Sequence, residues 1–130
     1  MLRLVKAGLA ALLVVAFAGI GRAAYDVEAA ALPALNLELL VVEAEGCIYC
    51  QIFRRDVLPA YQASPRAGSV PIGFLDVNEV EPAKLALEAP IDEVPTVLLL
   101  KDRQEVGRIT GYVGPESFFH AVNRLIARIE

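Results

Sequence analysis

The chain has 130 residues, with 12 lysines and arginines against 16 aspartates and glutamates, and its formal net charge is −4. An acidic chain of this kind argues against nucleic acid or an anionic membrane surface as the partner. Its two cysteines and single histidine are too few for a closed zinc site, which takes four ligands.

The first segment has the pattern of a secretory signal. Arg3 and Lys6 give it a positive start, and residues 7–20 form an uncharged apolar run. Residues 21–23 (Gly-Arg-Ala) then provide small residues at the two positions that a signal peptidase reads. The apolar run is shorter than the roughly 20 residues of a membrane span. We therefore predict a signal peptide over residues 1–23, cleaved after its last alanine, with an uncleaved anchor as the alternative.

The rest of the chain is long enough for one small domain with a single core. Without the signal it would hold nine basic and sixteen acidic residues, a formal charge of −7. Residues 24–35 are alanine-rich and form a lead-in, and residues 36–130 form the expected domain.

Strand and helix patterns alternate along this domain. The first apolar run alternates only weakly, which is typical of a strand buried on both faces. The expected elements in chain order are a strand at 37–44, a helix at 50–63 bent or ended early by Pro59, a strand at 71–77, a short helix at 82–88, strands at 94–100 and 105–112, and a helix at 116–129. This β-α-β-α-β-β-α order predicts an α/β fold in which helices flank a mixed four-stranded sheet, parallel strands first and a hairpin second.

The two cysteines, Cys47 and Cys50, are separated by two residues and follow the first expected strand. If the segment after them is helical, their sulfurs meet at the helix start and can form a disulfide. Such a bond stabilises little, because the chain-entropy relation gives about 2 kcal/mol for a four-residue loop and about 3 kcal/mol for a fifteen-residue loop. We interpret the pair as redox-active rather than structural.

This order of elements, with Cys-x-x-Cys at the first strand-to-helix junction, resembles the thioredoxin superfamily. The segment Val94-Pro95-Thr96 stands where that family has its cis-proline, and a terminal hairpin follows it. The resemblance extends over roughly residues 36–129. It implies a thioredoxin-like fold and the activity of a thiol–disulfide oxidoreductase that needs neither a cofactor nor a metal.

One branch of the superfamily is more similar than the others. Residues 46–50 (Gly-Cys-Ile-Tyr-Cys), residues 111–114 (Gly-Tyr-Val-Gly) and Phe118-Phe119 are similar to the exported thioredoxins of bacterial sulfur-oxidation (Sox) systems. That resemblance implies a periplasmic reductase of the oxidised cysteine of a sulfur-carrier protein, reduced again by a membrane thiol electron transporter. We expect a monomer that acts on partner proteins with a disulfide or an oxidised cysteine.

The motif assigns a role to each cysteine. Cys47 would be the attacking thiolate, because free N–H groups and the positive end of a helix dipole favour an anion there. Cys50 lies one turn further into the helix and would resolve the mixed disulfide.

The remaining site residues are expected to position the substrate. A cis peptide bond at Pro95 would face the cysteines and leave the backbone of Val94 free to pair with an extended substrate segment. The alternative is an ordinary trans proline at a strand start. Thr96 and the dipeptide Ile48-Tyr49 complete this set. Tyr112 is expected to be a packing residue outside the site.

The chain departs from the thioredoxin pattern near the cysteines. Val41 stands six residues before Cys47, where thioredoxins have a buried acid. Glu43 lies on the same strand face and could replace that acid, or it could be a solvated residue at a strand end. Gly46 replaces the usual tryptophan. Because Glu43 and Glu45 precede Cys47 and disfavour its thiolate, the sequence favours a reductase over a strongly oxidising enzyme.

Two alternatives use the same cysteines. Gln51 follows the pair where covalent haem attachment needs a histidine, so a c-type haem is excluded. A Cu(I) ion between the two thiolates remains, which would make the protein an exported copper chaperone without redox turnover. A thiol oxidase or isomerase of the same fold is the other alternative, and the reduction potential distinguishes it from a reductase.

Overall fold

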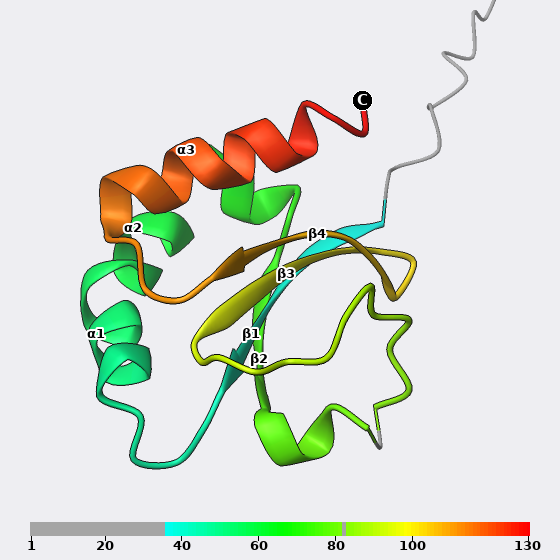
Figure 1. Cartoon of the computed structure of the whole chain (residues 1–130). Helices are drawn as coiled ribbons and strands as arrows, with labels where there is room; N and C mark the ends of the chain where they lie inside the picture. Colours follow the sequence, from blue (N-terminus) through cyan, green and yellow to red (C-terminus); the bar gives the residue numbers. More distant parts are fainter. Residues whose placement is uncertain (1–35, 82) are drawn as a thin grey trace, which may run out of the picture. The chain divides into compact units, whose positions relative to one another are not determined.

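The computed structural model describes residues 36–81 and 83–130 (Figure 1). The predicted signal peptide at 1–23 and the predicted lead-in at 24–35 lie outside the described residues. Within the described part of the chain, no helix is long and apolar enough to cross a membrane.

A four-stranded sheet forms the centre of the domain (Figure 1). Its strands are β1 (Leu37–Glu43), β2 (Ile72–Asp76), β3 (Thr96–Lys101) and β4 (Gln104–Thr110). They lie in the order β2-β1-β3-β4, with β2 parallel to β1, and with β3 antiparallel to both β1 and β4. The mixed four-stranded sheet predicted from the sequence is confirmed.

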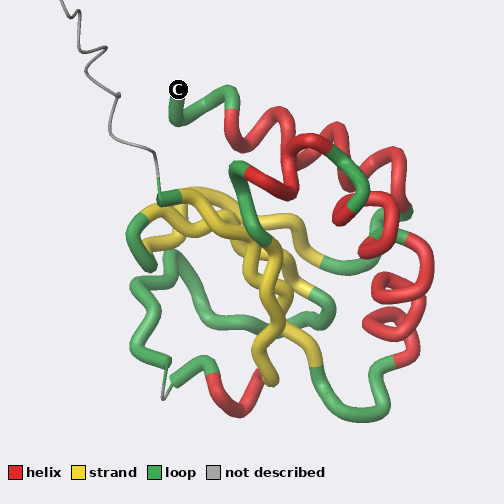
Figure 2. Tube along the Cα trace, turned by 180° about the vertical axis from the view of Figure 1, so that it is seen from behind, coloured by secondary structure: helices red, strands yellow, loops and turns green. Residues whose placement is uncertain are grey.

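The helices lie on one face of this sheet, as two opposite views agree (Figures 1 and 2). They are α1 (Ile48–Asp56), α2 (Leu58–Gln62) and α3 (Pro115–Ile126), and two short 3₁₀ helices, η1 (Pro65–Gly68) and η2 (Val77–Glu79), adjoin β2. The single helix predicted at 50–63 is divided at Val57. Pro59 explains the division, because it has no N–H to donate and its ring clashes with the carbonyl four residues earlier.

The core has two parts, one on each face of the sheet. On the helix face, Phe53 of α1 packs edge-on against Phe118 of α3, with ring centroids 5.3 Å apart. Leu39 and Val41 of β1 belong to this part, whereas Val42 belongs to the part on the opposite face. The prediction that the first strand is buried on both faces is therefore correct.

The helix predicted at 82–88 is wrong. Residues 83 and 84 form a turn, residues 85–88 are not helical, and Ala86 forms a parallel bridge to Gln104 at the edge of β4. Lys84 has a φ of 50°, in the left-handed region that an α-helix does not contain. The cause is visible in the spacing of Leu85 and Leu87, two residues apart, because this spacing puts both side chains on one side of an extended segment. Within residues 77–81 and 83–95, the observed order thus has no α-helix between β2 and β3.

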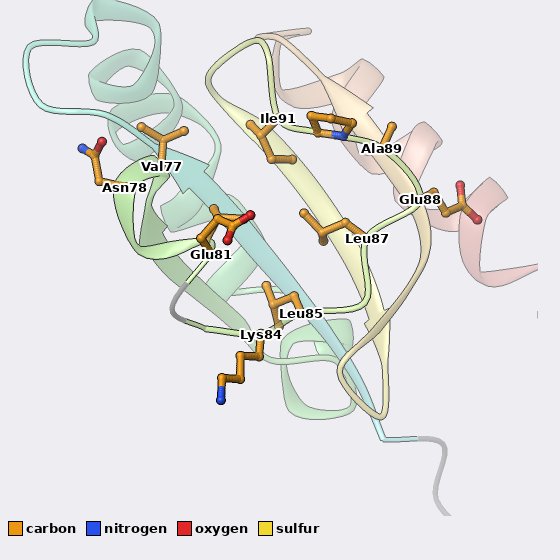
Figure 3. Close-up of a pocket in the computed structure, with 11 residues that line it drawn as sticks. Val77, Asn78, Glu81, Lys84, Leu85, Leu87, Glu88, Ala89 and Ile91 are labelled. Atoms are coloured by element: carbon orange, nitrogen blue, oxygen red, sulfur yellow. The ribbon is translucent and has the colours of Figure 1, made fainter.

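Without an α-helix in its described residues, the loop between β2 and β3 covers the second face of the sheet itself. Leu85, Leu87 and Ile91 pack against the buried side chains of Val42 and Leu98. Figure 3 shows these loop side chains in front of the sheet, with the polar residues Glu81, Lys84 and Glu88 around them. The loop therefore closes the core and leads directly to the residues before β3.

An ion pair on β4 holds this loop. Both carboxylate oxygens of Glu105 accept hydrogen bonds from Arg108, at 2.5 and 2.7 Å, and the backbone N–H of Glu88 donates to the same carboxylate at 2.9 Å. Arg108 also donates to the carbonyls of Ala89 and Pro90, at 2.7 and 3.1 Å. The side chain of Glu105 is fully buried. The pair thus fixes the path of the loop as well as its own strand.

A β-bulge makes this pair possible. Residues three apart on a regular strand point to opposite faces. Here Leu100 pairs with Glu105 but Leu99 pairs with Gly107, which leaves one extra residue, Val106, in β4. Because of this extra residue, the side chains of Glu105 and Arg108 both point to the face of the sheet that the loop between β2 and β3 covers.

Truncation of Arg108 tests this anchor. Arg108→Ala leaves the buried Glu105 carboxylate without its cation, so we expect a loss of about 3 kcal/mol in the free energy of unfolding, measured by chemical denaturation. Arg55→Ala is the matched control, because Arg55 pairs with Asp56 on the exposed surface of α1. An Arg108→Ala midpoint as close to wild type as that of Arg55→Ala would contradict the anchoring role.

The same carboxylate predicts a pH dependence. Burial raises the pKa of Glu105, but the hydrogen bonds from Arg108 and from the Glu88 N–H outweigh burial and hold the pKa below its usual value of 4.5. A depressed pKa in the folded state means that the stabilisation is present above about pH 4.5 and is lost as the pH falls through the folded value. We expect the free energy of unfolding of wild type to fall relative to that of Glu105→Gln below this pH. A constant difference between the two proteins down to about pH 3 would disprove the linkage.

Candidate active site

The two cysteines are joined at the junction between β1 and α1. Cys47 and Cys50 form a disulfide, with Cα atoms 5.3 Å apart. Cys47 is half-buried, whereas Cys50 is only 3% exposed and packs inside α1. A partner can therefore reach the sulfur of the first cysteine and not that of the second.

Cys47 is the N-cap of α1. Its Sγ accepts a hydrogen bond from the backbone N–H of Cys50 at 3.1 Å. No acidic residue lies in the first turn of α1, and Arg54 and Arg55 lie in its last turn. A thiolate at Cys47 would thus be stabilised by a backbone donor and by the positive end of the helix dipole.

The segment before β3 lies against this sulfur. The carbonyl oxygen of Val94 is 3.8 Å from Cys47 Sγ, and the Val94–Pro95 peptide bond is cis, as expected from the sequence. Val94 precedes the first paired residue of β3, so it has no ladder partner within the described residues. Thr96 is buried, and its hydroxyl donates to the carbonyl of Glu93 at 2.7 Å. Thr96 therefore fixes the turn before β3 and has little surface to offer a substrate.

The end of β4 returns to the same place. The N–H of Gly111 donates to the carbonyl of Pro95 at 2.9 Å. Gly111 has a φ of 76°, and a Cβ at this position would stand 2.5 Å from a carboxylate oxygen of Glu93. The positive φ favours glycine here because of backbone strain, and a side chain would also displace the exposed, flexible end of Glu93.

An exposed apolar surface borders the disulfide. Ile48 and Tyr49, between the cysteines, are 60% and 57% exposed, and Val113 after β4 is 40% exposed. The ring of Tyr49 stacks on the ring of Tyr112, with centroids 6.3 Å apart. Tyr112 packs against the helix-side core, as expected from the sequence, and its ring also lies beside the exposed Tyr49.

The acid that thioredoxins bury near the second cysteine has no counterpart at Val41, which is fully buried among apolar side chains. Both carboxylate oxygens of Glu43 accept hydrogen bonds from Arg54, at 2.5 and 2.9 Å. The guanidinium of Arg54 also lies 3.7 Å from the centroid of the Phe74 ring. Glu43 therefore ties the end of β1 to α1, and its role as a substitute acid stays a prediction.

Sequence reasoning missed the contribution of residues 111–113. The tight turn at Asp102 and Arg103 could have predicted this contribution. In an antiparallel hairpin the end of the second strand lies beside the start of the first, so residues 111–113 lie near the residues before β3. The observed pair Thr96 and Thr110 follows this rule.

This geometry suits exchange between a dithiol and a disulfide. An accessible sulfur lies at a helix N-terminus, a shielded sulfur lies within bonding distance, and an unpaired stretch of backbone lies beside them. In the described part of the chain, no group of three or more His, Cys, Asp and Glu side chains is arranged to hold a metal ion.

Comparison with known proteins gives the family. A model of the thioredoxin-like domain matches residues 36–126. The periplasmic thioredoxin SoxS from Paracoccus pantotrophus, solved in its reduced form, is 32% identical, with a TM-score of 0.67 over 72% of this chain and 99% of that chain. No match was found among curated proteins.

Other solved structures support the fold. The mitochondrial thioredoxin 3 of Saccharomyces cerevisiae is 24% identical, with a TM-score of 0.54 over 69% of this chain and 79% of its own. The thioredoxin of Malassezia sympodialis is 21% identical, with a TM-score of 0.58 over 70% of this chain and 78% of its own. The family match and the joined pair of Cys47 and Cys50 lead to one conclusion: this chain belongs to the thioredoxin-like family and is a thiol–disulfide oxidoreductase.

Proposed function

We infer that the protein is an exported reductase of disulfides or oxidised cysteines in partner proteins. The observation that carries this proposal is the asymmetry of the pair: Cys47 is accessible at the N-cap of α1, and Cys50 is buried behind it. One accessible and one shielded sulfur suit a cycle in which the first attacks and the second resolves.

The cycle starts from the reduced protein. The thiolate of Cys47 attacks one sulfur of the partner disulfide, the other partner sulfur leaves as a thiolate, and a mixed disulfide forms. The thiolate of Cys50 then attacks Cys47 Sγ, which releases the second partner thiol and forms the disulfide seen here. Two electrons pass to the partner, and a thiol donor must return them. We propose a membrane thiol electron transporter as that donor.

Several residues would hold the partner during this exchange. An extended partner segment would pair with the free backbone of Val94, in the manner of an added strand. Pro95 and Thr96 would keep that backbone in place, and the exposed side chains of Ile48 and Tyr49 would contact the partner's apolar surface.

Two observations support export and the choice of partner. Residues 1–23 have the order of charge, apolar run and small residues that a secretory signal has. The similar SoxS structure is that of a periplasmic thioredoxin. We therefore propose the periplasm as the location and the oxidised cysteine of a sulfur-carrier protein as the substrate.

The order of attack can be tested by trapping. In Cys50→Ser the mixed disulfide cannot be resolved, so we expect the pre-reduced variant, incubated with native insulin, to accumulate a mixed disulfide between Cys47 and an insulin cysteine that appears on a non-reducing gel. Cys47→Ser is the matched control, and its remaining cysteine is buried. Both variants should reduce insulin no faster than the dithiol donor alone. An adduct that forms equally well in Cys47→Ser would reverse the assigned roles.

The direction of electron transfer can be tested by the reduction potential of the cysteine pair, measured in glutathione or dithiothreitol redox buffers. A reductase should have a potential near about −270 mV, and a potential near about −120 mV would make the protein an oxidant instead. Titration of the reduced protein with Cu(I) tests the copper chaperone: tight binding without insulin reduction would replace the reductase proposal.

A further inference from the structure

Glu93 precedes the residue whose backbone lies against the disulfide. It is exposed, and it precedes Val94, whose carbonyl lies 3.8 Å from Cys47 Sγ. Its own carbonyl accepts the hydrogen bond from Thr96, so its backbone is held in place. Its carboxylate lies over Gly111, where a Cβ would stand only 2.5 Å away. The fixed backbone therefore keeps the charge of this exposed side chain at the edge of the site.

This carboxylate has no cation of its own within residues 36–81 and 83–130. The ion pairs of the described residues neutralise Glu43, Asp56 and Glu105 with arginines and do not include Glu93. The same pairs occupy Arg54 and Arg55, the two cations of the helix that carries the cysteines. The negative charge of Glu93 is thus available to an incoming partner.

The expected mode of substrate binding brings that partner close. A segment that pairs with the backbone of Val94 would run past Glu93, and its cysteine would face Cys47. Side chains flanking that cysteine would then lie near the Glu93 carboxylate. A lysine or arginine there would gain an opposite charge, and an aspartate or glutamate would meet a like charge. Coulomb attraction at the rim of a site of this kind raises the rate of productive encounter.

We propose that Glu93 is a specificity-determining residue, which selects partner segments whose oxidised cysteine is flanked by a positively charged side chain. The inference rests on the proposed reductase function and names the chemistry of its substrate. Glu93 acts on the choice of partner, and the sulfur chemistry belongs to Cys47 and Cys50.

The test uses three short peptides that differ only in the residues flanking a single cysteine, which are lysine, glutamine or glutamate. Each peptide is supplied as its symmetric disulfide, and the pre-reduced protein converts it to two peptide thiols while Cys47 and Cys50 become oxidised. A flanking lysine also speeds attack by any thiolate. The quantity compared is therefore the ratio of the second-order rate constants of this single turnover between wild type and Glu93→Gln for each peptide.

We expect this ratio to rise about threefold above one for the lysine peptide and to fall about threefold below one for the glutamate peptide, with glutamine between them. At about 1 M salt the Debye length is about 3 Å, so the ratios for the lysine and the glutamate peptides should both return toward one. Glutamine retains the shape of glutamate, so the fold over Gly111 is kept, and a denaturation midpoint equal to that of wild type checks this.

Glu130→Gln is the matched control. It removes the same charge from the C-terminal end of the chain, which lies at the opposite end of the domain from the β1–α1 junction (Figures 1 and 2). We expect it to preserve the peptide preference of wild type. Equal ratios for the three peptides, or the same change in Glu130→Gln, would overturn the selectivity alone. A wild-type protein that reduces none of the peptides would overturn the proposed function and the selectivity together.

Discussion

The buried pair of Glu105 and Arg108 is the interaction on which the rest of the site depends. In its described residues the loop between β2 and β3 holds the short 3₁₀ helix η2 and no α-helix to define its path, and the apolar contacts of Leu85 and Leu87 are not directional. Hydrogen bonds from Arg108 to two successive carbonyls of the loop give that direction. Because the loop continues into Val94 and Pro95, its path decides where the backbone beside Cys47 lies. A charged pair on β4 thus positions the backbone beside Cys47.

Strand β4 contributes both to the anchor of the loop and to the backbone beside Cys47. Near its start the bulge at Val106 turns Glu105 and Arg108 toward the loop, and at its end Gly111 donates to the carbonyl of Pro95. A slip of the β3–β4 register by one residue would reverse the faces of all side chains on β4. It would also move Gly111, and put a residue with a side chain at the position of positive φ beside Glu93. The register of a single hairpin therefore governs the loop anchor and the site together.

These relations explain which features the sequence predicts and which it does not. The strands and the start of α1 are predictable, because apolar runs, Gly46 and the cysteine spacing are local signals. The helix at 82–88 was predicted wrongly, since Leu85 and Leu87 alternate as in an extended chain and pack on a sheet face that no local pattern reveals. The pairing of Glu105 with Arg108 depends on a bulge, and the stacking of Tyr112 on Tyr49 depends on how a hairpin meets a helix. Such contacts join elements far apart in the sequence.

The charges around Cys47 bear on the direction of electron transfer. The sequence places two acids before this cysteine, but the structure pairs Glu43 with Arg54, so only Glu45 keeps the effect that was inferred for both. Against it stand the N–H of Cys50 and the positive end of α1, which favour the thiolate. A strongly oxidising pair needs a thiolate that is stabilised without such opposition. The remaining charge of Glu45 therefore supports the proposed reductase.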